Sequence, residues 1–515
     1  MLGGSGHNSR GEAKKNVTKV EKSEPRYNRA ALFYVLAFAL FSLYPIYSFI
    51  YTVISMIDKH GLLTGNIQTV LKTMTVPMML GLFAILTFNL IDTFFISLLG
   101  TESLAAISFT FPVTFGVSCI TLGIGMGLSA NVGKLLGQDD SADAARFSTH
   151  GLLLAVLLVM IASTIGYFSI EPLFTYLGAT PELLPLIDQY MSVWYVTIPL
   201  LVIPMAGNSV IRATGDTKTS AKIMMAAGFI NGGLDPLLIF GYGPFPELGI
   251  QGAAIASAVS WLGALIAILY VLIYREKMVA LPQFNYIIND WKQILKIGTP
   301  AAFSSAMNPL SGAILMIILA KFGTESVAAY GAALRIESIM IIVLMSLSSI
   351  LMPFIAQNMG AKNPQRSFDA LFIAMRFSLL FQFGLFVLMV PLSWPIASLF
   401  SQEAVHQDQG VQQTLWHFLL IVPFSYGFQG IVMILVSGLN AMHLPLRAFF
   451  WNFARLFIFT LPAAWFGSQL YGVEGLFIGI AIGNIIGGCC AYGYAIYFKK
   501  QMKAEMRIED EARDI

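Results

Sequence analysis

The sequence GTESLAA at residues 100–106 returns as GTESVAA at residues 323–329, an offset of 223 residues. The same offset relates five further pairs of residues: Pro77 with Pro300, Gly137 with Gly360, Gly215 with Gly438, Gly249 with Gly472, and Gly252 with Gly475. Six matches at one spacing are hard to obtain by chance. The pattern therefore predicts two copies of one unit of about 200 residues.

The composition indicates that lipid, and not water, surrounds most of this chain. Of its 515 residues, 57% are hydrophobic and 11% are charged. A soluble globular protein carries about 25% charged residues. We therefore expect an all-α membrane protein.

Apolar runs set the number of spanning helices, because a spanning helix needs about 20 apolar residues. Twelve such runs follow residue 72, centred near residues 88, 118, 158, 200, 231, 262, 309, 341, 384, 425, 457 and 485. Each copy then holds six helices, and both copies enter the membrane from the same side. This predicts two parallel six-helix bundles with a substrate cavity between them.

The runs also give the expected domain boundaries. They are an N-terminal extension (1–65), a first bundle (66–275), a linker (276–296), a second bundle (297–498) and a tail (499–515).

Positive charge is distributed unevenly among the loops. Thirteen Lys and Arg residues lie in or beside the loops after even-numbered runs and five lie in the tail, whereas Lys321 alone follows the odd-numbered runs. By the positive-inside rule, the even-numbered loops and the C-terminus are cytoplasmic. The expected location is the bacterial inner membrane.

The N-terminal extension allows three interpretations. Residues 1–29 are polar, and residues 34–57 form a further apolar run that Pro45 interrupts. In the first this run spans the membrane, in the second it lies at the interface or folds back, and in the third it precedes a natural start at Met56. The sequence gives no reason to prefer one of the three.

Several function classes lack their sequence signals here. No nucleotide-binding loop ending in Gly-Lys-Ser/Thr is present, which argues against an ATP-driven pump. No His-Glu-x-x-His or Gly-x-Ser-x-Gly motif occurs, and the three cysteines lie in apolar runs. We expect neither an enzyme, nor a structural metal site, nor a nucleic-acid partner.

Five ionisable residues lie inside the apolar runs, where each costs about 2.5–3.5 kcal/mol near mid-membrane. They are Asp92, Asp235, Arg335, Glu337 and Arg455. Asp92 is a candidate for cation binding, with a simple position near a wet helix end as the alternative. For Arg335 and Glu337 a structural role is as plausible as a substrate role. We expect Arg455 to extend its guanidinium to the cytoplasmic surface.

The fifth run carries the strongest polar pattern, Asn231-Gly-Gly-Leu-Asp235-Pro236. Asn231 and Asp235 are four residues apart and share one helix face. Pro236 has no backbone N–H, so it leaves a carbonyl without its usual donor. An amide oxygen, a carboxylate and a carbonyl suit Na⁺, and the carboxylate alone suits H⁺. A hydrogen-bonded helix kink is the structural alternative.

Five motifs in order resemble the multidrug and toxic-compound extrusion (MATE) family over roughly residues 66–498. They are Asn89-x-x-Asp92-Thr93 running into Leu99-Gly100, Arg212-Ala-Thr-Gly-Asp-Thr-Lys218, Asn231-x-x-x-Asp235-Pro236-x-x-Ile-Phe-Gly241, Gly252-Ala-Ala-Ile-Ala-Ser257, and the duplicated frame itself. The motif Arg335-Ile-Glu-Ser338 also resembles one found in helix 8 of the family.

The resemblance implies two six-helix bundles in a V shape and drug export driven by inward flow of H⁺ or Na⁺. It looks closest to the DinF-like branch, whose coupling site lies in the first bundle. Carried over, that site comprises Asp92, Tyr190, Asn231, Asp235 and Ser257, where the family usually has Thr at the last position. Pro77 matches a proline at which helix 1 bends in that branch. The seventh helix (297–321) lacks the coupling Glu of NorM-like members.

We therefore expect a secondary-active antiporter that exports amphipathic, often cationic, drug-like compounds as a monomer. It would need no cofactor besides the coupling ion, with Na⁺ held transiently at Asp92, Asn231 and Asp235. The alternatives are a flippase for lipid-linked saccharides and a membrane-embedded binding or sensor protein. The repeat offset sends Asp92 to Leu315 and Asp235 to Ile458, so the coupling site is expected in the first copy alone.

Overall fold

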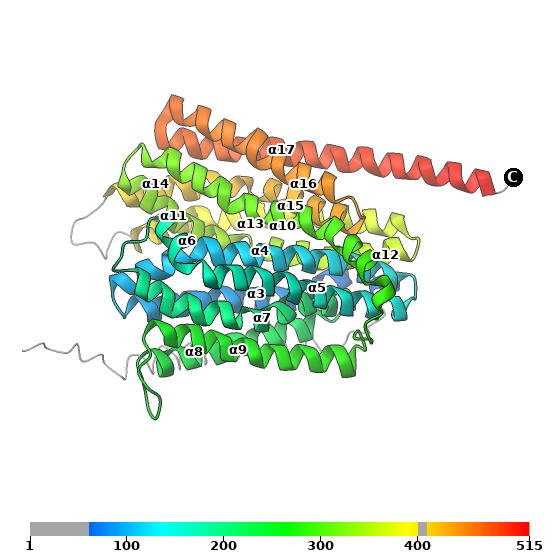
Figure 1. Ribbon diagram of the computed structural model, residues 1–515. Coiled ribbons are helices and arrows are strands. Elements are labelled where there is room, and N and C mark those ends of the chain that lie inside the picture. The colour runs from blue at the N-terminus through cyan, green and yellow to red at the C-terminus, as the bar shows by residue number, and fades with distance from the viewer. Residues whose placement is uncertain (1–60, 400–408, 514–515) are drawn as a thin grey trace, which may run out of the picture. The chain divides into compact units, whose positions relative to one another are not determined.

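The computed structural model describes residues 61–399 and 409–513 (Figure 1). Two compact units divide the chain at Ile57 and Asp58, and the description below concerns the second unit. The apolar run 34–57, the polar residues before it and the alternative start at Met56 lie outside the described residues.

The first half of the described chain (61–275) consists of helices joined by loops. Its elements are α2 (Gly61–Thr64), α3 (Ile67–Ser97), α4 (Thr101–Gly137), α5 (Ser141–Phe168), α6 (Ile170–Tyr176), α7 (Leu184–Ala213), α8 (Thr217–Ile239), α9 (Ile250–Tyr270) and the π-helix η1 (Val271–Arg275).

The second half (284–513) repeats this arrangement with more interruptions. Its elements are α10 (Phe284–Ala320), α11 (Thr324–Met340), α12 (Ile342–Gly360), α13 (Pro364–Leu399), α14 (Gln409–Ile421), the 3₁₀ turn η2 (Val422–Ser425), α15 (Tyr426–Ala441), α16 (Pro445–Phe453), the π-helix η3 (Ala454–Thr460) and α17 (Leu461–Arg513). Helix α10 starts at Phe284, so its first turns occupy much of the stretch expected as a linker.

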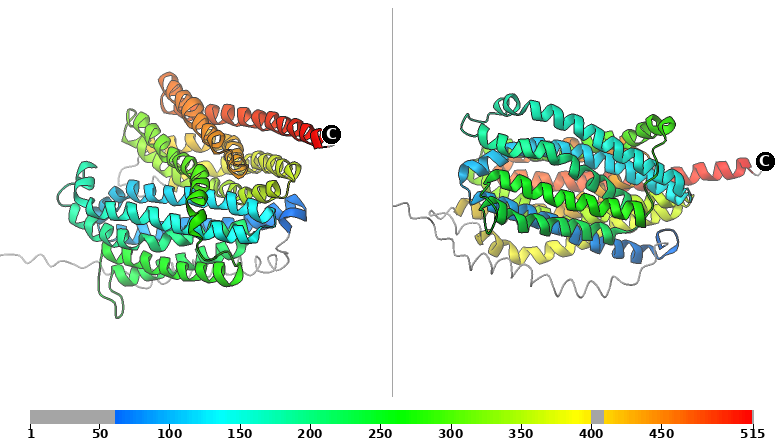
Figure 2. Two further views of the ribbon diagram at one scale, coloured as in Figure 1. Left: turned by 45° about the vertical axis from the view of Figure 1, so that its right-hand side comes forward. Right: turned by 60° about the horizontal axis from the view of Figure 1, so that its bottom comes forward.

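Ten helical segments of the described residues are long and apolar enough to cross a membrane. One of them, residues 445–505, holds two spans, because Tyr471 and Gly472 leave the helical conformation inside α17. Helix α8 adds a further span that is less apolar because it carries Lys218, Lys222 and Asp235. The described helices therefore agree with the twelve expected spans. Figures 1 and 2 show the end of α17, in red, running past the ends of the other helices.

The repeated glycines adopt matching backbone conformations, which explains their constant spacing. Gly100 and Gly323 precede α4 and α11 with φ of 114° and 106°. Gly249 precedes α9 with φ 54° and ψ −133°, and Gly472 has φ 60° and ψ −136°. Residues with a Cβ rarely adopt these conformations, so glycine is required at the same turn of both copies.

The contacts between the two halves follow the repeat. Helix α4 packs against α10, and its counterpart α12 packs against α3, the counterpart of α10. Helices α4 and α12 also pack against one another. This pairing is what a pseudo-twofold axis between parallel repeats produces.

Gly137 and Gly360 form a pair of close contacts between the two halves that obeys this pseudo-twofold relation. A Cβ on Gly137 would lie 2.0 Å from the carbonyl oxygen of Gln357, and one on Gly360 would lie 2.1 Å from that of Lys134. Lys134 and Gln357 are themselves 223 residues apart. Two glycines thus let α4 and α12 touch backbone to backbone at the end of the bundle where the basic loops gather, called the basic end below.

A buried polar cluster ties α5 to α10 at the same end. Asp290 lies 2.7 Å from His150 Nδ1 and accepts a hydrogen bond from Arg146 at 3.1 Å. The backbone N–H of Gln283 donates to His150 Nε2 at 3.0 Å, so Nδ1 is the nitrogen that donates to Asp290. His150 and Asp290 are 0% and 1% exposed. The sequence did not reveal this cluster, because its residues are far apart in the chain.

His443, in the turn between α15 and α16, gives a testable pH dependence. Burial, with the positive charges of Lys134 and Lys296 nearby, lowers the pKa of His443 to about 4. The unfolded chain then binds a proton at higher pH than the folded chain does, so stability falls as the pH drops from 6.5 towards 4. We expect a loss of about 2 kcal/mol at pH 5 relative to pH 8.

The measurement is thermal unfolding of the purified protein in detergent across this pH range. Since His443 has a φ of 59°, which Asn tolerates, the comparison is with His443→Asn. The unfolding temperature of the unmodified protein should fall relative to that of the variant as the pH falls. A difference that stays constant from pH 8 to pH 4 would contradict the assignment.

Candidate cation-coupling site

The expected coupling residues come from four helices of the first half. Asp92 lies on α3, Tyr190 on α7, Asn231 and Asp235 on α8, and Ser257 on α9. Helix α8 packs against α3, α7 and α9. Pro77 lies earlier on α3, which continues as one helix on both sides of it.

Small residues on α8 let α3 approach closely enough to bring the two carboxylates together. A Cβ on Gly228 would lie 2.1 Å from the ring of Phe88, and one on Gly232 would lie 3.0 Å from the same ring. Phe88 also packs edge-on against Phe229, with ring centroids 5.0 Å apart. The apolar contact made by Phe88, one turn before Asp92 on α3, therefore depends on glycine at two successive turns of α8.

Hydrogen bonds join three of the five residues. The amide Nδ2 of Asn231 lies 3.3 Å from both Asp235 Oδ1 and Ser257 Oγ, and it donates to each. Asp92 lies within electrostatic range of Asp235, and Tyr190 lies within range of both carboxylates. The structure thus brings all five expected residues into one region.

The carboxylates are incompletely satisfied. Asp235 is 0% exposed, and its Oδ2 has no hydrogen-bond partner among the described residues. The same holds for Asp92 Oδ1, which is also buried. A buried carboxylate oxygen without a donor is costly, so a bound cation would supply what the protein does not.

The oxygen atoms available here suit H⁺ or Na⁺ better than a transition metal. No group of three or more His, Cys, Asp or Glu side chains that could hold a metal occurs in the described part of the chain. Pro236 has no backbone N–H, so the carbonyl of Gly232 one turn earlier lacks its usual helix donor. The two carboxylates and the Ser257 hydroxyl are hard oxygen ligands.

A second polar cluster, which the sequence showed only in part, lies in the other half. Glu337 on α11 lies beside Tyr426 and Gln429 of α15 and within electrostatic range of Arg455 on η3. Arg455 donates from Nη2 to Asn308 of α10 at 2.9 Å. Asn308 and Gln429 are polar residues inside apolar runs, and that signal could have identified them.

Arg455 corrects one expectation. Its side chain does not extend to the surface but is buried at 5% exposure, and its Nε has no hydrogen-bond partner among the described residues. The π-helix η3 carries it, and such local widening of a helix is frequent at functional sites. Arg335, two residues before Glu337, is exposed, in contrast to Arg455.

The charges of Glu337 and Arg455 should be energetically coupled. We expect Glu337→Gln and Arg455→Gln each to lower the unfolding temperature, because each leaves the other charge buried without its counter-charge. The double variant should lose less than the sum, with a coupling energy of about 0.5–3 kcal/mol. Additive losses in chemical or thermal unfolding would show that the two charges do not interact.

Carboxylates buried between the helices of a duplicated membrane bundle indicate a membrane transport protein. Comparison with known proteins agrees. The profile of the MatE family matches residues 77–237 and 300–466, two stretches whose starts are 223 residues apart. A FAD transporter from Shewanella oneidensis is 46% identical over 451 residues, which cover 87% of this chain and 99% of that protein.

Other relatives are more distant. The probable multidrug resistance protein YoeA of Bacillus subtilis is 25% identical over 78% of this chain and 88% of its own length. The crystal structure of the Vibrio cholerae MATE transporter VcmN in the bent form superposes with a TM-score of 0.80 at 31% identity, covering 85% of this chain and 98% of VcmN. The chain belongs to the MATE family and is a multi-pass membrane transport protein.

Proposed function

We propose that this protein is a secondary-active exporter that couples outward movement of an organic solute to inward flow of H⁺ or Na⁺ at Asp92 and Asp235. The observation that carries the proposal is the pair of buried carboxylate oxygens that lack a donor. A cation entering from outside would bind these oxygens, and its release to the cytoplasm would return them to the unpaired state. Placement in the inner membrane, a cytoplasmic C-terminus and membership of the DinF-like branch are parts of this proposal.

The contact at Gly137 and Gly360 supports alternating access. The two halves meet there backbone to backbone, so the basic end is closed in this structure, and parting the halves at this contact as two rigid bodies would open it. Opening one end while the other closes would expose the solute and the coupling site to one side at a time.

For the solute, we propose an aromatic dinucleotide such as FAD. The FAD transporter of Shewanella oneidensis matches 87% of this chain at 46% identity. Such a solute carries an anionic pyrophosphate, and Arg335 is suited to bind it. An exposed guanidinium inside a spanning helix belongs in a water-filled pathway and not against lipid.

A cationic, amphipathic drug is the second candidate. The relatives YoeA and the multidrug export protein MepA of Staphylococcus aureus support it, the latter at 29% identity over 56% of this chain. The two solutes differ in charge, so one variant separates them. Arg335→Gln should slow FAD transport severalfold and leave transport of ethidium unchanged.

The test uses proteoliposomes with an imposed pH gradient, and then with an imposed Na⁺ gradient. We expect FAD movement only with protein present and only with the gradient of the coupling ion. Ethidium transported in place of FAD would support the drug exporter. Movement of neither solute under either gradient would overturn both and favour the flippase or sensor alternatives.

A further inference from the structure

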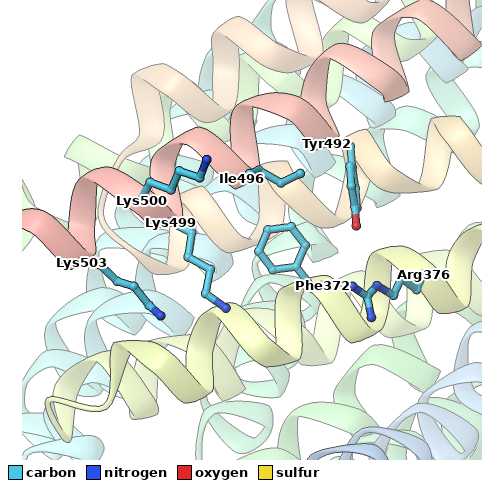
Figure 3. A pocket seen from close by; sticks show the side chains of 7 residues that line it. All are labelled: Phe372, Arg376, Tyr492, Ile496, Lys499, Lys500 and Lys503. Carbon is cyan, nitrogen blue, oxygen red and sulfur yellow. The ribbon is translucent and has the colours of Figure 1, made fainter.

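We propose that a pocket between α13 and α17 binds the phosphate headgroup of an anionic phospholipid. This pocket lies outside the coupling site, on other helices, and has a volume of about 300 Å³. Four cations line it: Arg376 from α13 and Lys499, Lys500 and Lys503 from α17. Figure 3 shows Lys499 and Lys503 extending from α17 toward α13.

The lining of the pocket changes from apolar to cationic along α17. This order matches a phospholipid, whose apolar chains lead to an anionic headgroup. Tyr492 and Ile496 come first, and the three lysines follow on the same helix face. The ring of Tyr492 packs edge-on against that of Phe372 at 5.7 Å, which fixes the apolar floor of the pocket. Lys499 Nζ lies 5.4 Å from the centre of the Phe372 ring.

The cations outnumber their carboxylate partners. Asp369 accepts from Lys499 at 2.9 Å and also lies near Lys503. Among the described residues, no ion pair engages Arg376 or Lys500, and both side chains are exposed. One carboxylate thus faces four cations, so the pocket keeps a net positive charge that a phosphate would balance.

The position of the pocket selects a lipid as the source of that phosphate. Arg376 lies well inside α13, a helix apolar enough to span the membrane. Lys499, Lys500 and Lys503 follow the apolar part of α17. The pocket therefore straddles the boundary between apolar and basic parts of two helices, at the basic end of the bundle. Basic pockets between spanning helices on the cytoplasmic side are suited to anionic lipid headgroups.

The test is native mass spectrometry of the delipidated full-length protein titrated with phosphatidylglycerol or phosphatidylcholine. The variant is Arg376→Gln/Lys500→Gln/Lys503→Gln, which keeps Lys499 and its ion pair with Asp369. Each lost cation should weaken phosphatidylglycerol binding about fivefold, so the triple variant should bind about a hundredfold more weakly.

A matched control removes three exposed cations elsewhere at the same end, as Lys277→Gln/Lys292→Gln/Lys362→Gln. It should bind phosphatidylglycerol as the unmodified protein does, and all three proteins should unfold at similar temperatures. Equal binding by the pocket variant and the control would overturn the site. Equal binding of phosphatidylcholine, or displacement of the lipid by the same concentration of inorganic phosphate, would overturn the lipid as its ligand.

Discussion

Asp235→Asn is expected to reduce gradient-driven transport to the background of protein-free liposomes. The amide keeps the shape of the side chain but cannot take up H⁺ or hold Na⁺ as a carboxylate does. The same change should leave the free energy of unfolding unaltered or raise it by on the order of 1 kcal/mol, because it removes an unpaired buried carboxylate oxygen. Loss of function with retained stability is the signature of a functional carboxylate.

Two further variants complete this experiment. Asp92→Asn should behave like Asp235→Asn, whereas Asp188→Asn, on an exposed part of α7, should transport normally. The measurement is solute flux per inserted protein, together with thermal unfolding in detergent. Normal flux in Asp235→Asn, or a large loss of stability that accounts for the lost flux, would contradict the assignment.

Gly360→Ala is expected to have the largest effect on stability. Its new Cβ would lie 2.1 Å from the carbonyl oxygen of Lys134, so backbone must move and α12 must separate from α4. Overpacking of this kind costs about 1–3 kcal/mol. Gly137→Ala should have a similar effect, since it meets Gln357 in the same way. Transport should slow as well, because the two halves can no longer close at the basic end.

Gly331→Ala and Gly384→Ala serve as controls, with their unfolding temperatures measured in the same way. Both glycines are helical, and nothing lies within 4 Å of the Cβ that each would gain. Alanine there should be neutral or should stabilise the protein by about 0.4–1 kcal/mol. If Gly360→Ala unfolds at the same temperature as Gly384→Ala, the close contact between the halves is wrong.

Much of the fold could be predicted because lipid imposes a local rule on the sequence. Every spanning helix must be largely apolar, so each of the twelve runs can be recognised without knowledge of its neighbours. The repeat was visible for a similar reason. Gly249 and Gly472 each need a positive φ, and this local demand survives in both copies.

Part of the site could be predicted from the cost of charge in the membrane. Asp92 and Asp235 stand out in apolar runs, and the spacing of Asn231 and Asp235 gives one helix face. The contact of Asn231 with Ser257 could not be derived, because it depends on how α8 and α9 pack. Arg455 was misjudged for the same reason, since burial against Asn308 is invisible in the order of residues along one helix.

The sequence by itself determined the twelve-helix frame, its duplication and the candidate acids of the first copy, because hydropathy and glycine conformations act on short segments. Only the tertiary structure decided which polar groups meet. The Phe88 ring packs against Gly228 and Gly232, which lets α3 lie close to α8. A cluster of His150, Asp290 and Arg146 ties α5 to α10. Arg376 of α13 lines one pocket together with three lysines of α17. Such contacts depend on the distance between helices. Side-chain volume at the points where two helices cross sets that distance, so it cannot be derived from one segment alone.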